Sequence, residues 1–198
     1  MVSFMTVTRR RSLRALFGLG LLVSGMATPA DLDAVTLKEL TDNKGLNAKK
    51  FASYFGDFAY EFNADIQSAS TFLKREAGDC DDYAVLADYV LKQRGLGTRL
   101  IHVRLAGRVA HAVCYVAENK AYLDYNNRAV FFTLTKSGGE IRDIAGKVAD
   151  SLKANWTTAS EFSYSYSTRR KTMISTVSQT GGSEATPTPG KSSPFHVD

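Results

Sequence analysis

The chain has 198 residues, a net charge of +5 and a sequence pI near 9.2. The first 30 residues hold four arginines and no acidic residue, so the net charge of the rest is only +1. No basic stripe with interleaved aromatic residues follows, which excludes the usual kind of nucleic-acid-binding surface. The ~168 residues that remain are enough for one domain with one hydrophobic core.

Residues 1–30 have the three parts of an export signal. An arginine-rich segment at residues 8–14, which resembles a twin-arginine signal, precedes an apolar run at residues 15–26, and small residues follow up to Ala30. The run is too short to span a bilayer as a mature helix. We therefore expect a periplasmic or secreted protein with no stable membrane insertion after signal removal; an uncleaved N-terminal anchor is the alternative.

The segment from residue 31 to residue 78 is predicted to form three short helices and one extended stretch. The first helix is amphipathic, the second begins at the cap Asn47, and the third begins at Ser68 or Ser70 and ends at Gly78. Aromatic residues alternate with others over residues 58–62, which predicts a strand. These rings either belong to the core or include one that lines a substrate cleft.

A longer helix is predicted from Cys80 to Gly95. Apolar residues recur from Tyr83 onward at helical spacing, which indicates one buried face. Four strands with alternating side chains are then predicted, at residues 98–105, 109–117, 121–124 and 130–134. A helix followed by strands joined through short turns indicates an α+β fold with an antiparallel meander.

The remaining chain is predicted to add one helix at residues 141–154 and a final strand or extended cover from Trp156. The Ser/Thr/Gly/Pro-rich end has almost nothing to bury, which is typical of disorder. We expect three parts: an export signal at 1–30, a domain at 31–172 and a disordered tail at 173–198. The oligomeric state is left open by the sequence.

Cys80 lies at or just before the beginning of the long helix. Free backbone N–H groups and the positive end of the helix dipole favour a thiolate there, which makes Cys80 a candidate nucleophile. Asp79, Asp81 and Asp82 crowd the same turn. Their charge suits the helix dipole but disfavours a thiolate, so a positive group is needed nearby: an imidazolium, a metal ion, or both.

His111 lies among apolar residues in the second predicted strand, and Asp124 ends the third. A histidine in this setting is either a core residue or a positioned base. Because neighbouring antiparallel strands bring residues within hydrogen-bond reach, Asp124 can orient the His111 ring and stabilise its cation. A cysteine on a helix, a histidine on a strand and an aspartate on the next strand are in the order that a thiol triad needs.

Cys114 is the second of two cysteines, and a disulfide with Cys80 is the alternative to a catalytic role. Side chains alternate along a strand, so Cys114 points to the face opposite His111. If His111 faces Cys80, Cys114 does not. We therefore predict that Cys114 is a free, buried, small hydrophobic residue.

The seven-residue run from Gly78 to Ala84, together with His111-Ala112-Val113 and Leu123-Asp124, resembles the transglutaminase-like superfamily, and most of all the bacterial transglutaminase-like cysteine proteinases. The resemblance covers roughly residues 47–135. It implies an α+β, papain/transglutaminase-like fold in which the nucleophile helix packs on an antiparallel sheet. It also implies that Cys80 is the nucleophile, His111 the general base and Asp124 the orienting acid.

Some members of that family depend on calcium held by acids next to the cysteine. The matching positions are Asp79, Asp81 and Asp82, so the resemblance implies either a calcium ion here or no cofactor, with these acids capping the helix. Gln67 is a candidate oxyanion donor, and the Cys80 backbone N–H is the alternative.

The resemblance and the residues together predict an exported, cysteine-dependent amide hydrolase or transamidase that acts on a protein or peptide. An acyl-enzyme would be resolved by water in a peptidase and by an amine in a transglutaminase. A non-catalytic peptide- or cell-wall-binding module on the same fold is the alternative. A small cell-wall amidase with a similar Cys and His pair is a third interpretation.

Overall fold

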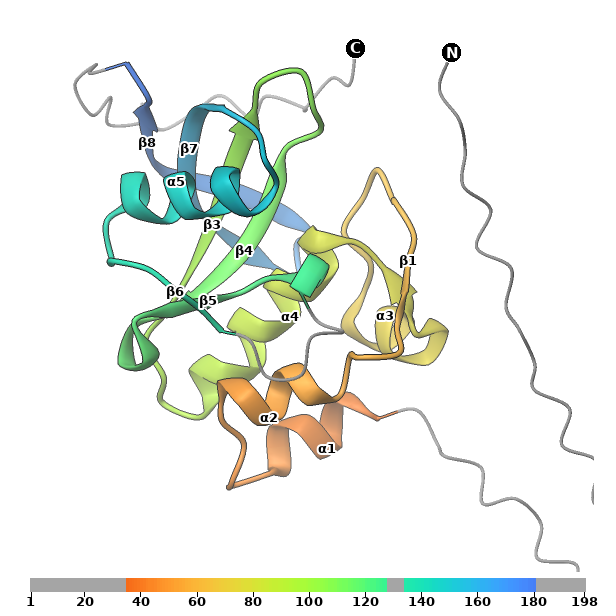
Figure 1. The fold of residues 1–198 in the computed structure, drawn as a ribbon. Coiled ribbons are helices and arrows are strands. Elements are labelled where there is room, and N and C mark those ends of the chain that lie inside the picture. Colours follow the sequence, from red (N-terminus) through yellow and green to blue (C-terminus); the bar gives the residue numbers. More distant parts are fainter. Residues whose placement is uncertain (1–34, 128–133, 181–198) are drawn as a thin grey trace, which may run out of the picture. The chain divides into compact units, whose positions relative to one another are not determined.

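The computed structural model describes residues 35–127 and 134–180, all within one compact unit that runs from Ala34 onward (Figure 1). The predicted export signal, most of the strand predicted at residues 130–134 and the tail from residue 181 onward lie outside the described residues. None of the helices in the described ranges is long and apolar enough to cross a membrane.

Three short helices precede the central one: α1 (Leu37–Asp42), α2 (Ala48–Ser53) and α3 (Ala69–Arg75). Each begins after a side chain that accepts a backbone N–H from its first turn, and these caps are Thr36, Asn47 and Ser68. The predicted caps Asn47 and Ser68 are confirmed. Each helix buries at least one large apolar residue, which anchors it to the core that surrounds the central helix.

A two-stranded parallel sheet fixes the backbone just before Cys80. Strand β1 (Ala59–Tyr60) pairs with β2 (Ala77–Gly78), so the extended stretch predicted at residues 58–62 forms only a short strand. The prediction that the preceding helix ends at Gly78 is wrong. It ends at Arg75, where Glu76 takes a left-handed conformation and frees the next two residues to pair with β1.

The predicted central helix is confirmed as α4 (Cys80–Gln93). Ten of its residues are buried, because helices α1 to α3 and the main sheet all contact it. The helix therefore lies inside the core and presents its first residue, Cys80, at the end of the sheet.

The main sheet has six strands: β3 (Thr98–Leu105), β4 (His111–Val116), β5 (Ala121–Leu123), β6 (Thr135–Lys136), β7 (Trp156–Ser165) and β8 (Arg170–Ser178). Their order is β6-β5-β4-β3-β7-β8 and every neighbouring pair is antiparallel. The predicted meander of β3, β4 and β5 is confirmed. Strand β8 was not expected, and the predicted domain end at residue 172 falls inside it, because β8 stays paired with β7 up to Ser178.

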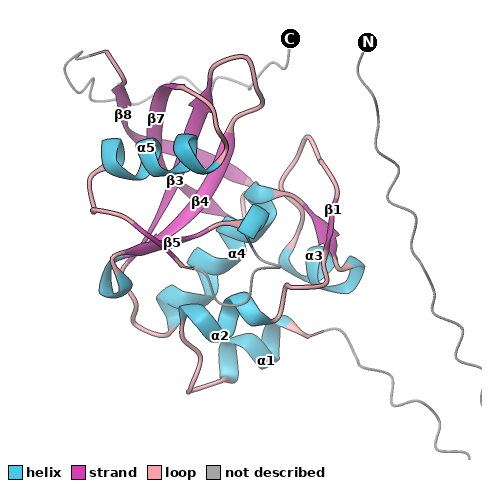
Figure 2. Cartoon of the chain, in the orientation of Figure 1, coloured by secondary structure: helices cyan, strands magenta, loops and turns pink. Residues whose placement is uncertain are grey.

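Helices cover both faces of this sheet (Figure 2). One core cluster joins α4 to residues such as Leu100, Cys114 and Phe162, whereas the other joins α5 (Ile141–Ser151) to alternating neighbours such as Ile101 and Val113. The α+β fold class, with the cysteine-bearing helix packed on an antiparallel sheet, is therefore confirmed.

Candidate active site

Cys80 is the first residue of α4 and is held by a reciprocal capping box. The Asp79 Oδ1 atom accepts the backbone N–H groups of Asp81 and Asp82 at 3.0 and 3.3 Å, and Asp82 Oδ2 accepts the N–H of Asp79 at 3.2 Å. Both caps are buried, and Cys80 is 7% exposed. The arrangement satisfies the first N–H groups of the helix and fixes the backbone on both sides of the thiol.

His111 and Asp124 meet at the same end of the sheet. His111 is the first residue of β4, and Asp124 lies between β5 and a short 3₁₀ turn, η2 (Tyr125–Asn127). The His111 Nε2 atom lies 2.8 Å from Asp124 Oδ1, which also accepts the N–H of Asn126 at 2.8 Å. Both side chains are buried, so the carboxylate holds the ring in one orientation.

The environment of His111 stabilises its cation. Burial lowers the pKa of His111, but hydrogen bonds and charge interactions with Asp124 and Cys80 outweigh burial and raise it to about 10. Because Nε2 is bonded to Asp124, the interaction with Cys80 falls to Nδ1. The structure thus brings together the three residues that the sequence singled out, and the His111 imidazolium is a positive group of the kind that a thiolate at Cys80 would need.

Cys114 is free and fully buried, as predicted, and it lies on the sheet face opposite Val113 and Tyr115, but the inference that this face points away from the cysteine-bearing helix is wrong. Its side chain does not point away from the cysteine-bearing helix: Cys114 belongs to the α4 cluster, and the charge of Asp88 on α4 acts on it. Strand β4 runs alongside α4, so His111 lies near Cys80 and Cys114 lies near Asp88, about 12 Å further along the helix. That distance along α4 is what keeps the Cys80 and Cys114 thiols apart.

The carboxylates of Asp79 and Asp82 are occupied by N–H groups of the chain. Asp79 Oδ2 accepts the N–H of Asn63 at 3.0 Å, and Asp82 accepts the backbone N–H and the side-chain amide of Gln67 at 2.7 and 2.8 Å. Burial raises the pKa of Asp79 to about 6 and also raises that of Asp82, while these hydrogen bonds oppose the shift. Both acids therefore stabilise the N-terminus of α4 and the segments that pack against it.

The prediction that Gln67 is the oxyanion donor is wrong. Its amide Nε2 donates to the Ala77 carbonyl at 3.0 Å and to Asp82 Oδ2 at 2.8 Å, which uses both amide hydrogens. Gln67 instead ties the capping box to β2. The Cys80 backbone N–H at the start of α4 remains the candidate oxyanion donor.

The side chains around Cys80 offer only part of the oxygen shell that a calcium ion takes. Asp79, Cys80 and Asp81 place their ligand atoms within 4.8 Å of one another, but one of these atoms is sulfur, whereas calcium takes six to eight oxygens. Asp82 accepts three N–H groups, and Asp81 Oδ1 pairs with Lys171 Nζ at 3.1 Å. The three acids proposed as ligands are thus engaged with groups of the chain itself.

Two further residues lie beside the site: His102, which the sequence did not single out, and Tyr60, one of the rings at residues 58–62 that were expected either in the core or lining a cleft. His102 on β3 is 9% exposed, and burial together with the positive charge of Lys171 lowers its pKa to about 4, so the ring is neutral at neutral pH. Tyr60 on β1 is 55% exposed; partial burial raises its pKa, and so do the negative charges of Cys80 and its two acidic neighbours. Tyr60 therefore marks a solvent-facing side of the site.

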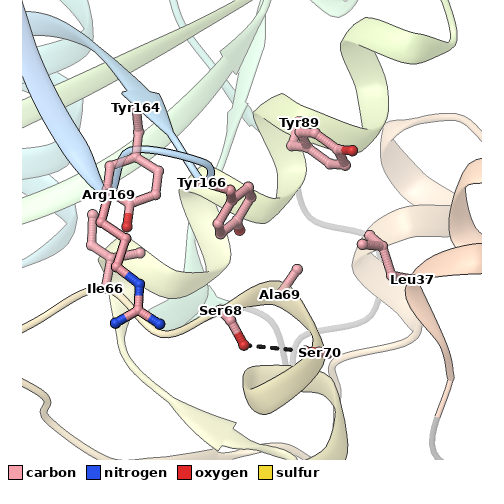
Figure 3. Close-up of a pocket in the computed structure, with 9 residues that line it drawn as sticks. All are labelled: Leu37, Ile66, Ser68, Ala69, Ser70, Tyr89, Tyr164, Tyr166 and Arg169. Atoms are coloured by element: carbon pink, nitrogen blue, oxygen red, sulfur yellow. Dashed lines mark hydrogen bonds between the residues drawn. The ribbon is translucent and has the colours of Figure 1, made fainter.

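A cavity of about 240 Å³ lies elsewhere in the described part of the chain (Figure 3). Tyr164, Tyr166 and Arg169 from the β7–β8 hairpin line one side, and Ser68 and its neighbours at the start of α3 line another. Cys80, His111 and Asp124 do not border it. The cavity is therefore separate from the candidate active site.

Comparison with known proteins gives two kinds of similarity. Residues 34–135 match the model of the transglutaminase-like domain family. Solved structures of LapG from Legionella pneumophila are also similar: the calcium-bound form has a TM-score of 0.43 and 18% identity over 62% of this chain and 71% of that chain. The EGTA-treated form has a TM-score of 0.44 and 17% identity over 62% and 69%. A comparison with curated proteins gives no match.

The family match is the informative one. It spans just over half of the chain and contains Cys80, His111 and Asp124 together with α1 to α4 and strands β3 to β5. The likeness to LapG is too weak to carry a conclusion about activity or ions. The chain belongs to the transglutaminase-like domain family.

Proposed function

We propose that the chain is an exported, cysteine-dependent amide hydrolase or transamidase that acts on proteins or peptides. The observation that carries this proposal is the buried group formed by Cys80, His111 and Asp124. The His111 ring is hydrogen-bonded to Asp124, has a raised pKa and interacts with the Cys80 thiol at the N-terminus of α4. Membership of the transglutaminase-like domain family supports the same chemistry.

Acylation would begin from the thiolate–imidazolium pair. The Cys80 Sγ atom attacks the amide carbonyl and forms the S–C bond, while the Cys80 N–H and the dipole of α4 stabilise the oxyanion. The tetrahedral intermediate collapses as the C–N bond breaks, and His111 gives its Nδ1 proton to the leaving amine. Asp124 keeps the ring oriented while its charge changes.

Deacylation runs the same steps with a second nucleophile. Neutral His111 takes a proton from water or from an amine, which attacks the thioester carbonyl and releases Cys80 as a thiolate. With water the product is a carboxylic acid, and with an amine it is a new amide. The triad chemistry is shared, so the acceptor that reaches the acyl-enzyme decides between hydrolysis and transamidation.

The substrate prediction is tested with casein in the presence and absence of a fluorescent primary amine. We expect casein fragments without the amine if the enzyme is a peptidase, or labelled casein with it if the enzyme is a transamidase. Cys80→Ala should remove either product, and Cys114→Ala should retain it because Cys114 is fully buried. Gel electrophoresis with fluorescence detection measures both.

Two outcomes would redirect the function. If casein stays intact and unlabelled while peptidoglycan fragments are cleaved in a Cys80-dependent way, the chain is a cell-wall amidase. If no substrate is turned over but peptides or cell-wall fragments bind equally well to the protein and to Cys80→Ala, the chain is a non-catalytic binding module.

Export is proposed from the first 30 residues, whose arginines, apolar run and small residues suit a cleaved signal. We expect the mature protein in the periplasm or medium, with an N-terminus near Ala30. Cell fractionation followed by mass spectrometry of the intact protein measures both the location and the new N-terminus. An intact first residue on a membrane-bound protein would contradict cleavage and favour the anchor.

A further inference from the structure

Lys171 is a cation that β8 brings to the active-site turn. Along β8, side-chain alternation places Lys171 on the same face as Met173, which packs against the α4 cluster. The Lys171 Nζ atom lies 3.1 Å from Asp81 Oδ1 and 4.1 Å from the ring centre of Phe162. The side chains of Lys171 and Asp81 are only 18% and 28% exposed, so water screens the pair less than it would a surface pair.

The three acids of the turn have different partners. Asp79 and Asp82 accept N–H groups of the chain, whereas Asp81 pairs with the ammonium of Lys171. Asp81 is next to the nucleophile in sequence, and its carboxylate lies within 4.8 Å of the Cys80 sulfur. An unbalanced charge at Asp81 would therefore act directly against a Cys80 thiolate.

We propose that Lys171 is the resident cation of this turn: its ammonium balances Asp81 beside Cys80, so that the active site works without a calcium ion. This inference rests on the proposed function for its catalytic meaning, but the absence of a calcium requirement can be tested without a substrate. Lys171 acts through Asp81 and is a positioning residue.

Two observations support the assignment. After burial, the positive charge of Lys171 also lowers the pKa of His102, so the ammonium acts on a second side chain beside the turn. Lys171 also lies outside residues 34–135, the part that matches the family model. The cation is therefore supplied by the β7–β8 hairpin of this chain and is separate from the cysteine motif.

The first experiment measures thermal unfolding and Cys80 alkylation of the full-length protein with calcium or with a chelator, in the Cys114→Ala background. We expect the unfolding midpoint and the alkylation rate to be the same in both conditions. A calcium-dependent rise in the midpoint, or loss of reactivity in the chelator, would overturn the proposal. If Cys80 reacts only like an ordinary thiol, the proposed function fails, while the unfolding midpoint still decides on calcium.

The second experiment removes the charge. Lys171→Met is expected to slow alkylation of Cys80 at neutral pH roughly fivefold, Lys171→Arg to restore the rate, and Arg170→Met, at the exposed neighbour on β8, to leave it unchanged. Because Asp81 is the partner, adding Asp81→Asn to Lys171→Met should cancel most of the loss. The proposed role of Lys171 would be refuted if Lys171→Met alkylates Cys80 as fast as the parent. It would also be refuted if neither Lys171→Arg nor the Lys171→Met/Asp81→Asn double variant recovers the alkylation rate.

Discussion

Replacing His111 with alanine is expected to lower the alkylation rate of Cys80 at about pH 6 by roughly 100-fold. The reason is that an ordinary thiol, with a pKa of ~8.5, is almost wholly protonated at that pH. In the parent protein the pKa of His111 is raised to about 10, so the ring stays protonated at this pH and would stabilise a Cys80 thiolate beside it. The measurement is the rate of iodoacetamide labelling across a pH series in the Cys114→Ala background.

Asp124→Asn is expected to have a smaller effect on Cys80 alkylation than His111→Ala. The variant keeps an oxygen near His111 Nε2 but loses the charge that helps to raise the His111 pKa, so this pKa should fall below about 10 in an NMR titration. The alkylation rate should lie between those of the parent and His111→Ala. Asp57→Asn removes the same charge from an exposed turn and should change neither value. Identical pH profiles for the parent and His111→Ala would show that no thiol–imidazole pair forms.

Replacing Gly78 with alanine is expected to destabilise the protein by about 3 kcal/mol and to slow alkylation of Cys80, since overpacking and a disturbed buried hydrogen bond each cost of that order. A Cβ atom on Gly78 would lie 2.5 Å from Asp82 Oδ2 and 2.6 Å from the ring of Phe72. Neither can move freely, because Asp82 is held by Gln67 and Phe72 is packed in the core.

Gly146→Ala on α5 is the matched control. A Cβ atom there would meet nothing within 4 Å, and alanine lowers the entropy cost of folding a helix, so a gain of about 0.5–1 kcal/mol is expected. Chemical denaturation gives the free energy of unfolding of both variants. A Gly78→Ala protein as stable as the parent would mean that β2 can shift away from Asp82 at little cost.

The placement of most candidate site residues could be predicted, because it depends on short runs of sequence. The thiol at a helix start follows from Cys80 and the helical spacing after it, and the order of His111 and Asp124 follows from two neighbouring strands joined by a short connection. The position of Cys114 could not be predicted in this way. Alternation assigns a side chain to a face of a strand, but it does not say which helix covers that face or how far along the helix the contact falls.

The elements whose energetics are local could be predicted from the sequence: the caps Asn47 and Ser68, the central helix α4 and the meander of β3 to β5. These depend on hydrogen bonds and apolar spacing within one or two turns of chain. The pairing of β7 and β8 beside β3, which brings Lys171 to Asp81 across 90 residues of sequence, is seen only in the folded chain. Such a contact depends on which strands pair and which side chains are buried together, and no short run of residues records that.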